Sequence, residues 1–198
     1  MADKGDKTRA EILTAAKALF IKKGYSAVSM SDLCLASKLS RGGLYRHFSS
    51  AGEVFGALLR LDRDSWEAEL KKAMEAGVPA ADMLRYFFHS CIMEIQENAG
   101  RLSLATYEYE RNSKEKDSFI NERFGSAVSM MKRLLEYGIA RGELFAQDSA
   151  LEAKRLVIYI EGLKTASAAI EFTRGELEAQ LKYELMKLTK KSGDKNAN

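Results

Sequence analysis

The chain has 198 residues, of which 46% are hydrophobic and 30% charged, so it is long enough to bury a core of its own. No stretch is apolar for long enough to span a bilayer, and residues 1–7 lack the apolar segment of a signal peptide. We therefore expect a cytoplasmic protein with no membrane partner. The net charge is only +3, but residues 1–50 hold nine Lys or Arg against four Asp or Glu. A basic N-terminal part favours a polyanionic partner such as nucleic acid.

Start and stop signals for helices recur along the chain, and the alternating pattern of β-strands is absent. Capping residues and glycines bound the expected helices: Thr8 to Gly24, Ser29 to about Ser37, Ser40 to about Phe48, Ser50 to Gly77, Ala80 to about Asn98, Leu102 to Arg111, about Lys114 to Arg141, Asp148 or Ser149 to about Phe172, and Thr173 to about Lys190. The sequence thus predicts an all-α fold of about nine helices. The polar residues 191–198 are expected to be a disordered tail.

The two short helices between residues 29 and 48 are joined by a tight turn and are too short to be stable alone. Their inward positions are apolar: Met30, Leu33, Cys34, Leu39, Leu44 and Phe48. We expect the first helix and the start of the fourth to hold them at an angle, which gives a three-helix head with a helix-turn-helix. The second short helix then presents polar residues and two glycines outward, and its N-terminus is suited to a phosphate.

The run from Thr8 to Phe48 resembles the DNA-binding head of the TetR family of transcriptional regulators. The resemblance is carried by Thr8-Arg-x-x-Ile-Leu, Lys23-Gly-Tyr, Ser29-Met-x-Asp-Leu and Leu39-Ser-Arg-Gly-Gly-Leu-Tyr-x-His-Phe. It covers about fifty residues without a gap, and the remainder resembles the family only in helix number and length. It implies a DNA-binding domain over residues 1–50 and a larger helical domain for effector binding and dimerisation over residues 51–190.

The family also implies a role for individual residues of the head. The segment Ser40–His47 would be the recognition helix in the major groove, with Arg41 at base edges and Tyr45 and His47 at phosphates. Arg46 could make either kind of contact, and Thr8 and Ser29 would bind the DNA backbone. The DNA-binding set is therefore Thr8, Ser29, Ser40, Arg41, Gly42, Gly43, Tyr45, Arg46 and His47.

Three positions depart from the family pattern. Lys38 replaces the usual glycine of the turn, so it is expected to adopt a left-handed conformation at some cost. Gly43 replaces a threonine and Ala51 replaces a lysine, and both changes remove a polar contact. The last two departures predict that the contacts to phosphates are weaker or differently distributed, with more weight on Arg41, Arg46 and backbone N–H groups.

In the family, helices four to seven surround an effector cavity. The corresponding candidates for ligand binding are Trp66, Phe87, Phe88, Cys91, Tyr107, Glu108, Phe124, Val128 and Met131. The alternative is that these side chains fill an ordinary core. Glu108 and Glu161 lie within apolar runs, and a buried acid is costly unless it is paired. Each could pair with a basic side chain or meet a cationic ligand, and both alternatives stay open.

The family further implies that the last two helices form a four-helix bundle between two subunits. The candidate interface residues are Leu156, Tyr159, Ile160, Leu163, Ser167, Ile170, Leu177, Leu181 and Leu185. The alternative is that they pack against the body of their own chain. A two-fold dimer would place two recognition helices about one turn of DNA apart or a little more, which predicts a palindromic operator.

Catalytic and metal-binding constellations are not apparent in the sequence. Cys91 and His89 are two residues apart, a spacing that does not place them on one helix face. With two histidines and two cysteines, we predict no metal site, no cofactor and no enzyme activity. The expected function is that of a ligand-responsive repressor, a homodimer released from its operator by a small molecule. The alternative is a helical small-molecule carrier or protein-binding adaptor that has lost specific DNA binding.

Overall fold

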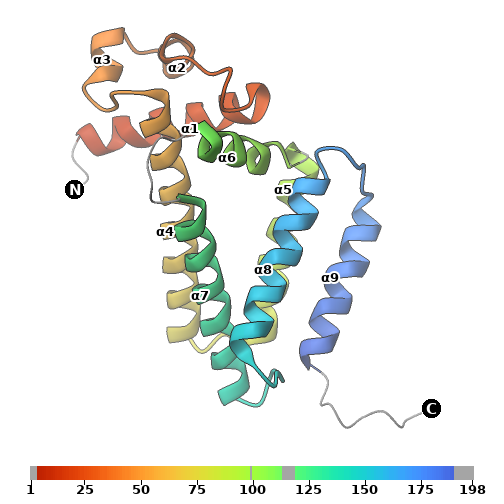
Figure 1. Cartoon of the computed structure of the whole chain (residues 1–198). Helices are drawn as coiled ribbons and strands as arrows, with labels where there is room; N and C mark the ends of the chain where they lie inside the picture. Colours follow the sequence, from red (N-terminus) through yellow and green to blue (C-terminus); the bar gives the residue numbers. More distant parts are fainter. Residues whose placement is uncertain (1–3, 99, 113–118, 190–198) are drawn as a thin grey trace. The chain divides into compact units, whose positions relative to one another are not determined.

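The computed structural model describes residues 4–98, 100–112 and 119–189, which form nine α-helices and no strand (Figure 1). The helices are α1 (Lys4–Lys23), α2 (Met30–Ser37), α3 (Arg41–Tyr45), α4 (Ala51–Glu75), α5 (Ala80–Asn98), α6 (Arg101–Asn112), α7 (Phe119–Ala140), α8 (Ser149–Ala166) and α9 (Arg174–Thr189). The predicted all-α fold is confirmed. No helix among the described residues combines the length and hydropathy needed to cross a membrane.

Most of the predicted helix boundaries are set by the caps that the sequence shows. Ser29 caps α2 and forms a capping box with Asp32, while Asp148 caps α8 through the N–H groups of residues 150 and 151. Thr173 and Glu176 bond to each other's backbone N–H groups at the start of α9. The glycines expected to end helices, Gly24, Gly77, Gly100 and Gly142, all have positive φ, as a left-handed C-terminal cap requires.

Three boundaries differ from the prediction. Helix α1 begins at Lys4, so Thr8 lies inside it, and Asp6 in the first turn suits the helix dipole. Helix α3 ends at Tyr45, because the N–H of His47 turns back to the carbonyl of Leu44. Helix α8 ends at Ala166, where the chain continues in tight turns instead of reaching residue 172. The predicted start of α7 at Lys114 and the tail 191–198 lie outside the described residues.

The chain divides into two compact units. Unit 1 comprises Met1–Asp64 and Arg101–Ile120, and thus contains α1, α2, α3, α6 and the first part of α4. Its core includes all six inward positions predicted for the short helices. Leu33, Cys34, Leu44 and Phe48 are buried, and Met30 and Leu39 pack against them. Unit 1 is larger than residues 1–50, because Leu102 and Ala105 of α6 join the same core.

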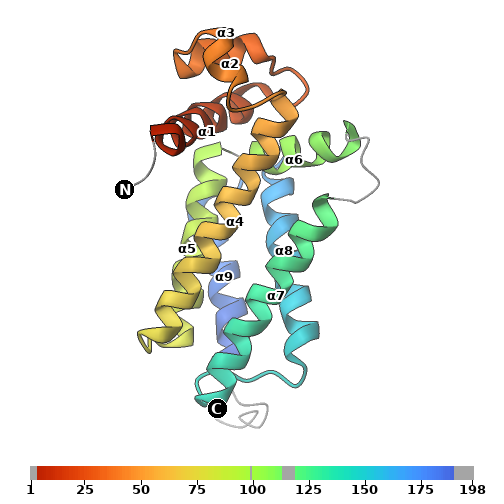
Figure 2. The same ribbon diagram turned by 90° about the vertical axis from the view of Figure 1, so that its left-hand side faces the viewer.

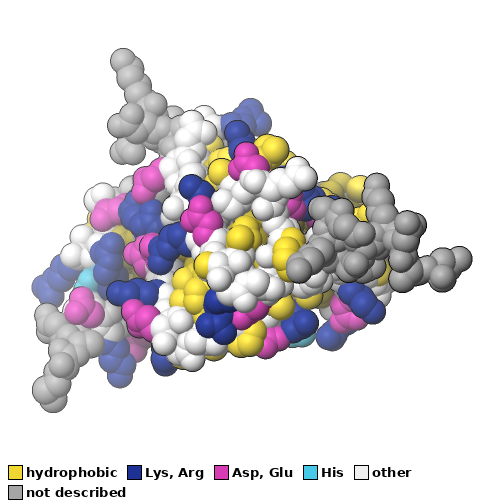
Figure 3. Space-filling model, turned by 90° about the horizontal axis from the view of Figure 1, so that it is seen from below, with side chains coloured by type: hydrophobic (Ala, Val, Ile, Leu, Met, Phe, Trp, Pro, Cys, Tyr) yellow, Lys and Arg dark blue, Asp and Glu magenta, His cyan; other side chains and the backbone are white. Residues whose placement is uncertain are grey.

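Unit 2 comprises Ser65–Gly100 and Asn121–Asn198, in which α5, α7, α8 and α9 lie alongside one another (Figures 1 and 2). A single hydrophobic core joins these helices with the end of α4. The N–H of Phe145 donates to the carbonyl of Leu188 at 2.7 Å, so the loop after α7 is tied to the end of α9. Acidic and basic side chains are intermixed on the face drawn in Figure 3, and hydrophobic side chains show between them.

Candidate functional site

Helix α1 packs against the two short helices. The Arg9 guanidinium donates to the carbonyl of His47 at 2.9 Å and lies 4.1 Å from the centre of the Phe48 ring. This contact fixes the chain just after α3 and uses cation–π attraction. Lys17 and Asp62, with 3.1 Å between ammonium and carboxylate, connect α1 to α4. The helix-turn-helix is therefore held on both sides by long helices, as the sequence predicted.

Helix α2 begins at a firmly bonded cap. The N–H and hydroxyl of Ser29 donate to the Asp32 carboxylate, which also accepts from the Lys23 ammonium at 2.6 Å. The hydrogen bond from Lys23, followed by those from Ser29, holds the pKa of Asp32 well below its usual range. Asp32 therefore stays ionised and ties α2 to the end of α1. The Ser29 side chain is exposed, although its hydroxyl is engaged in the cap.

Helix α3 presents the predicted recognition residues to solvent. The Ser40 hydroxyl accepts from the Gly43 N–H at 3.1 Å, and the buried Leu44 fixes the inner face. Arg41, Gly42 and Arg46 are exposed, and Tyr45 is 53% exposed. A methyl group added at Gly42 would meet nothing within 4 Å, so this surface is open to a second molecule. The Arg41 guanidinium donates to the Ser31 hydroxyl at 3.3 Å.

Eight of the nine predicted DNA-binding residues lie at the N-terminal caps of α2 and α3, on α3 or directly after it. His47 is half-buried, and the Arg9 bond to its carbonyl orients this position. Thr8 is the exception, because it lies within α1, four residues after the start of that helix. Its proposed role at the DNA backbone therefore loses the geometric basis on which it was predicted.

Helix α6 is anchored to the turn between α1 and α2. The Glu108 carboxylate accepts from the Ser26 N–H at 2.9 Å, and the Asn112 amide donates to the Ser26 hydroxyl at 3.1 Å. The Tyr109 ring packs edge-on against Tyr25, with ring centres 5.1 Å apart. Glu108 therefore bonds to the backbone of unit 1 in this structure, and its role in ligand binding stays a prediction. Sequence reasoning missed this anchor, because its partners are more than 80 residues apart.

Seven of the nine candidates for ligand binding belong to unit 2, where they lie in or beside its hydrophobic core. Trp66 packs edge-on against Phe87 at 5.6 Å between centres, and Phe87 lies beside Phe88. Cys91, Phe124, Val128 and Met131 belong to the same core or pack on it. Burial raises the pKa of the Cys91 thiol to about 11, so it is a neutral apolar group at physiological pH. The other two candidates, Tyr107 and Glu108, belong to unit 1.

Two ion pairs lie among these helices. The Lys164 ammonium of α8 is 2.5 Å from the Glu94 carboxylate of α5, and only 12% of the lysine side chain is exposed. Burial opposes the charge on Lys164, but Cys91, Glu94 and Glu161 together outweigh it and raise the pKa of the lysine. Glu161 pairs with Arg123 of α7 at 3.4 Å. Pairing with a basic side chain was one of the two alternatives for Glu161, while the hydrogen bond from Lys164 goes to Glu94.

Most of the predicted interface side chains on α8 and α9 face the interior of unit 2. Leu156, Ile160, Leu163, Ser167, Leu177 and Leu181 are buried within the chain, and Tyr159 and Leu185 are half-buried. Ile170, in the loop after α8, is 53% exposed. Six of the nine side chains therefore pack within their own chain, and the place of the set in a dimer stays a prediction. The exposed apolar side chains of the two helices are others: Leu151, Ile158, Tyr183 and Met186.

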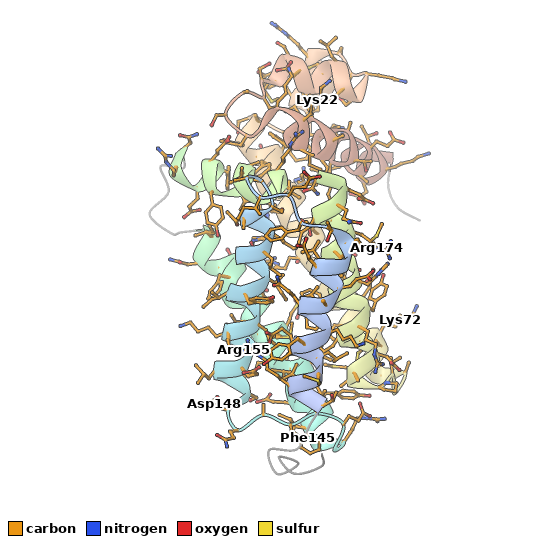
Figure 4. All side chains as sticks on the ribbon, turned by 90° about the vertical axis from the view of Figure 1, so that its right-hand side faces the viewer. Lys22, Lys72, Phe145, Asp148, Arg155 and Arg174 are labelled. Atoms are coloured by element: carbon orange, nitrogen blue, oxygen red, sulfur yellow. The ribbon has the colours of Figure 1, made fainter. Side chains whose placement is uncertain are left out.

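Helix α9 is joined to α8 by a group of charges. Arg155 of α8 is directed toward α9 in Figure 4 and donates to the Glu184 carboxylate at 2.6 Å. Lys187 and Glu152 complete the network. Within the part of the chain that the structure describes, no three His, Cys, Asp or Glu side chains gather as metal ligands would.

Comparison with known proteins gives matches along most of the chain. The family model for bacterial regulatory proteins of the tetR family matches residues 12–58, and the model for a tetracyclin repressor-like C-terminal domain matches residues 83–178. The HTH-type transcriptional regulator YfiR of Bacillus subtilis is 32% identical over 141 residues, which are 70% of this chain and 68% of YfiR. The HTH-type transcriptional repressor KstR2 of Mycobacterium tuberculosis is 26% identical over 68% of each chain. A TetR-family regulator from Agrobacterium tumefaciens has the same fold, with a TM-score of 0.75 and 19% identity over 94% of this chain and all of its own.

Proposed function

Because the chain belongs to the tetR family of bacterial regulatory proteins, we propose that it is a cytoplasmic repressor whose DNA binding is released by a small molecule. Its helix-turn-helix is the DNA-binding element of that family. KstR2, which is similar over 68% of both chains, is a repressor, and this supports repression as the outcome. The proposal has three parts: operator recognition by α3, effector binding in unit 2, and dimerisation through α8 and α9.

The observation that carries the proposal is the exposed surface of α3 on a buried support. Leu44 and Phe48 are almost wholly buried, whereas Arg41 and Arg46 point to solvent on the same short segment. An arginine can bind the two acceptor atoms of a guanine edge at once, which discriminates between bases by about 1–3 kcal/mol. In the proposed complex Arg41 reads a base, and Tyr45, Arg46 and the loop around His47 position the head on phosphates.

In the second part of the proposal, the effector binds in unit 2. The aromatic group of Trp66, Phe87 and Phe88, with the apolar side chains of α7, offers it an apolar contact surface. Two nearby ion pairs, Lys164–Glu94 and Arg123–Glu161, offer it polar partners. Such a mixture of apolar lining and a few polar groups is typical of small-molecule sites. Tyr107 and Glu108 are left out of this site, since Glu108 already bonds to the turn after α1.

Coupling between effector and operator is proposed to run through α4. This helix is continuous over 25 residues, and it contributes its first part to unit 1 and its last part to unit 2. An effector that binds better to one position of α4 than to another would shift the spacing of two heads in a dimer. The strength of the regulation would then equal the difference in effector affinity between the two states.

The dimer is proposed to form through the outer faces of α8 and α9. Leu151 and Ile158 are seven residues apart, which places them on one face of α8, and both are more than half exposed. On α9, Tyr183 is 56% exposed and Met186 is 37% exposed. These side chains replace the buried residues predicted from the sequence as the centre of the interface.

Selection of bound duplexes from a random DNA pool at near-physiological salt tests the function directly. We expect an inverted repeat with half-sites about one turn apart or slightly more. Arg41→Ala is expected to reduce the affinity for that sequence about tenfold to a hundredfold and to relax the preference at one position of each half-site. Arg174→Ala, which changes an exposed arginine of α9, is the matched control and should bind as the unmodified protein does. Recovery of no preferred sequence would favour the carrier or adaptor instead.

A further inference from the structure

Lys38 has the one positive φ that is not at a glycine in the described residues. Its backbone angles are φ 56° and ψ 30°, in the left-handed helical region. For a residue with a β-carbon this conformation is unfavourable by about 1–2 kcal/mol, and only glycine adopts it freely. A non-glycine residue that keeps such a conformation points to a role that glycine cannot fill.

The turn itself requires the left-handed conformation. The N–H of Lys38 bonds to the carbonyl of Leu35, and the N–H of Leu39 bonds back to the carbonyl of Cys34 at 3.1 Å. This pair of bonds is the Schellman motif that ends many helices, and its left-handed position is normally glycine. Leu39 then packs on the core of unit 1, so the turn is held from both sides. Glycine would meet every backbone requirement at position 38.

The side chain of Lys38 has no evident structural role among the described residues. It is exposed, and no hydrogen bond or ion pair from its ammonium group occurs among residues 4–98, 100–112 and 119–189. Lys17 and Lys23 of unit 1 differ in this respect, since each pairs with an aspartate on a neighbouring helix. The positive charge at the turn is therefore left available to a partner.

Lys38 lies in the turn between α2 and α3, three residues before the predicted base-reading residue Arg41. Ser31 and Leu35 are four residues apart on α2, so they share one side of that helix. The Ser31 hydroxyl accepts from Arg41, and Leu35 is 80% exposed, so this side is open and adjoins the start of α3. The exposed side of α2 and the start of α3 thus adjoin each other, and the exposed Lys38 lies in the turn between the two helices.

We propose that Lys38 binds a phosphate of the operator DNA, and that the protein keeps a lysine in the left-handed position of the turn for this contact. The inference rests on the proposed DNA-binding function. Lysine is a long side chain with a point charge, which suits a phosphate beside the groove more than a base edge. A phosphate contact from Lys38 would compensate for the polar contacts that Gly43 and Ala51 cannot make.

The experiment compares Lys38→Gly, Lys38→Gln and Lys38→Arg with the unmodified full-length chain, on the duplex recovered from the random pool. Melting temperature and the salt dependence of DNA affinity are measured for each. Lys38→Gly is expected to melt about 2–4 °C higher, because it relieves the unfavourable conformation. Lys38→Gln and Lys38→Arg keep that conformation and should melt close to the unmodified protein.

Both uncharged variants are expected to bind about tenfold more weakly at near-physiological salt. Their slopes of log affinity against log salt should be smaller by about 0.9 for each phosphate that the Lys38 ammonium no longer neutralises. Lys38→Arg should keep the slope, and Lys182→Gln, which removes an exposed charge from α9, is the control for net charge. An unchanged affinity and slope in Lys38→Gln would overturn the phosphate contact alone. A lack of specific binding by the unmodified protein would overturn the proposed function and this inference together.

Discussion

Gly100, between α5 and α6, has no room for a side chain. A β-carbon at this position would lie 1.7 Å from the carbonyl oxygen of Lys164 and 2.7 Å from the Ser167 hydroxyl. The φ of Gly100 is also positive, at +67°. Two independent physical reasons therefore require glycine here: the backbone conformation and the close approach of α8. Gly142 has a similar φ of +70°, but open space around it, so only the first reason applies.

Alanine substitutions at these two glycines measure the two free-energy costs separately. Gly142→Ala is expected to lower the free energy of unfolding by about 1 kcal/mol, the cost of a left-handed alanine. Gly100→Ala is expected to lower it by about 3–5 kcal/mol, because the added methyl group must push α5 and α8 apart. Denaturant unfolding of both variants measures the difference. Equal losses of stability in the two variants would show that α8 moves away from the added methyl group at no cost in free energy.

At the scale of the element, α9 depends on a buried acid for its attachment to α8. The side chain of Glu184 is only 7% exposed, and it accepts hydrogen bonds from Arg155 and Lys187. Burial opposes its ionisation, but the hydrogen bonds from these two basic side chains outweigh burial and lower the pKa of Glu184. At this point, α8 and α9 are held together by charged side chains instead of apolar ones.

Removal of that charge is expected to destabilise the protein in a pH-dependent way. Glu184→Gln should lower the free energy of unfolding at pH 7 by about 1–3 kcal/mol, because Arg155 and Lys187 lose a charged acceptor. The folded pKa lies below the unfolded value of about 4.3, so the carboxylate stabilises the fold above that pH. The stabilisation is lost as pH falls below about 4 toward the folded pKa.

The difference between the Glu184→Gln variant and the unmodified protein should therefore shrink below about pH 4. Urea unfolding at several pH values measures it. Glu178→Gln is the matched control, since Glu178 pairs with Arg174 on the same helix but is 50% exposed. That variant should change stability by less than about 0.5 kcal/mol. A Glu184 effect that persists unchanged at low pH would show that packing, not charge, attaches α9.

At the scale of the whole molecule, the proposed regulator requires two copies of the chain. The outer faces of α8 and α9 expose Leu151, Ile158, Tyr183 and Met186, which a single copy leaves in contact with water. Large apolar side chains that cluster on a surface mark sites of association. A two-fold dimer through these faces would also give the operator its inverted repeat.

Sedimentation of the unmodified protein at micromolar concentration is expected to give twice the mass of the chain. Ile158→Glu should shift this mass toward one chain, because a charge in the middle of an apolar interface is desolvated without a partner. Leu61→Glu places the same charge on an exposed leucine of α4 and should leave the dimer intact. A dimer that survives Ile158→Glu would place the interface on another surface.

Local sequence determined most of the helix boundaries and the support of the recognition helix. The caps at Ser29, Ser40 and Thr173 each bond to a residue three positions away, so they can be predicted from a short stretch of sequence. The inward positions of the short helices are likewise fixed by helical spacing. The left-handed Lys38 was expected from the resemblance to the TetR family, which usually has glycine at this turn, and the structure confirms that conformation.

Only the tertiary structure decided which long helices meet. The bond from Ser26 to Glu108 joins residues 82 positions apart, and Lys164 and Glu94 are 70 apart. An apolar stripe shows that a helix face is buried, but it does not say against which partner. The resemblance to the family placed apolar side chains of α8 and α9 at a subunit interface, and in the structure most of these side chains are buried within their own chain. Helical spacing is a property of one segment, while the choice of partner depends on how all the faces of the chain are buried at once.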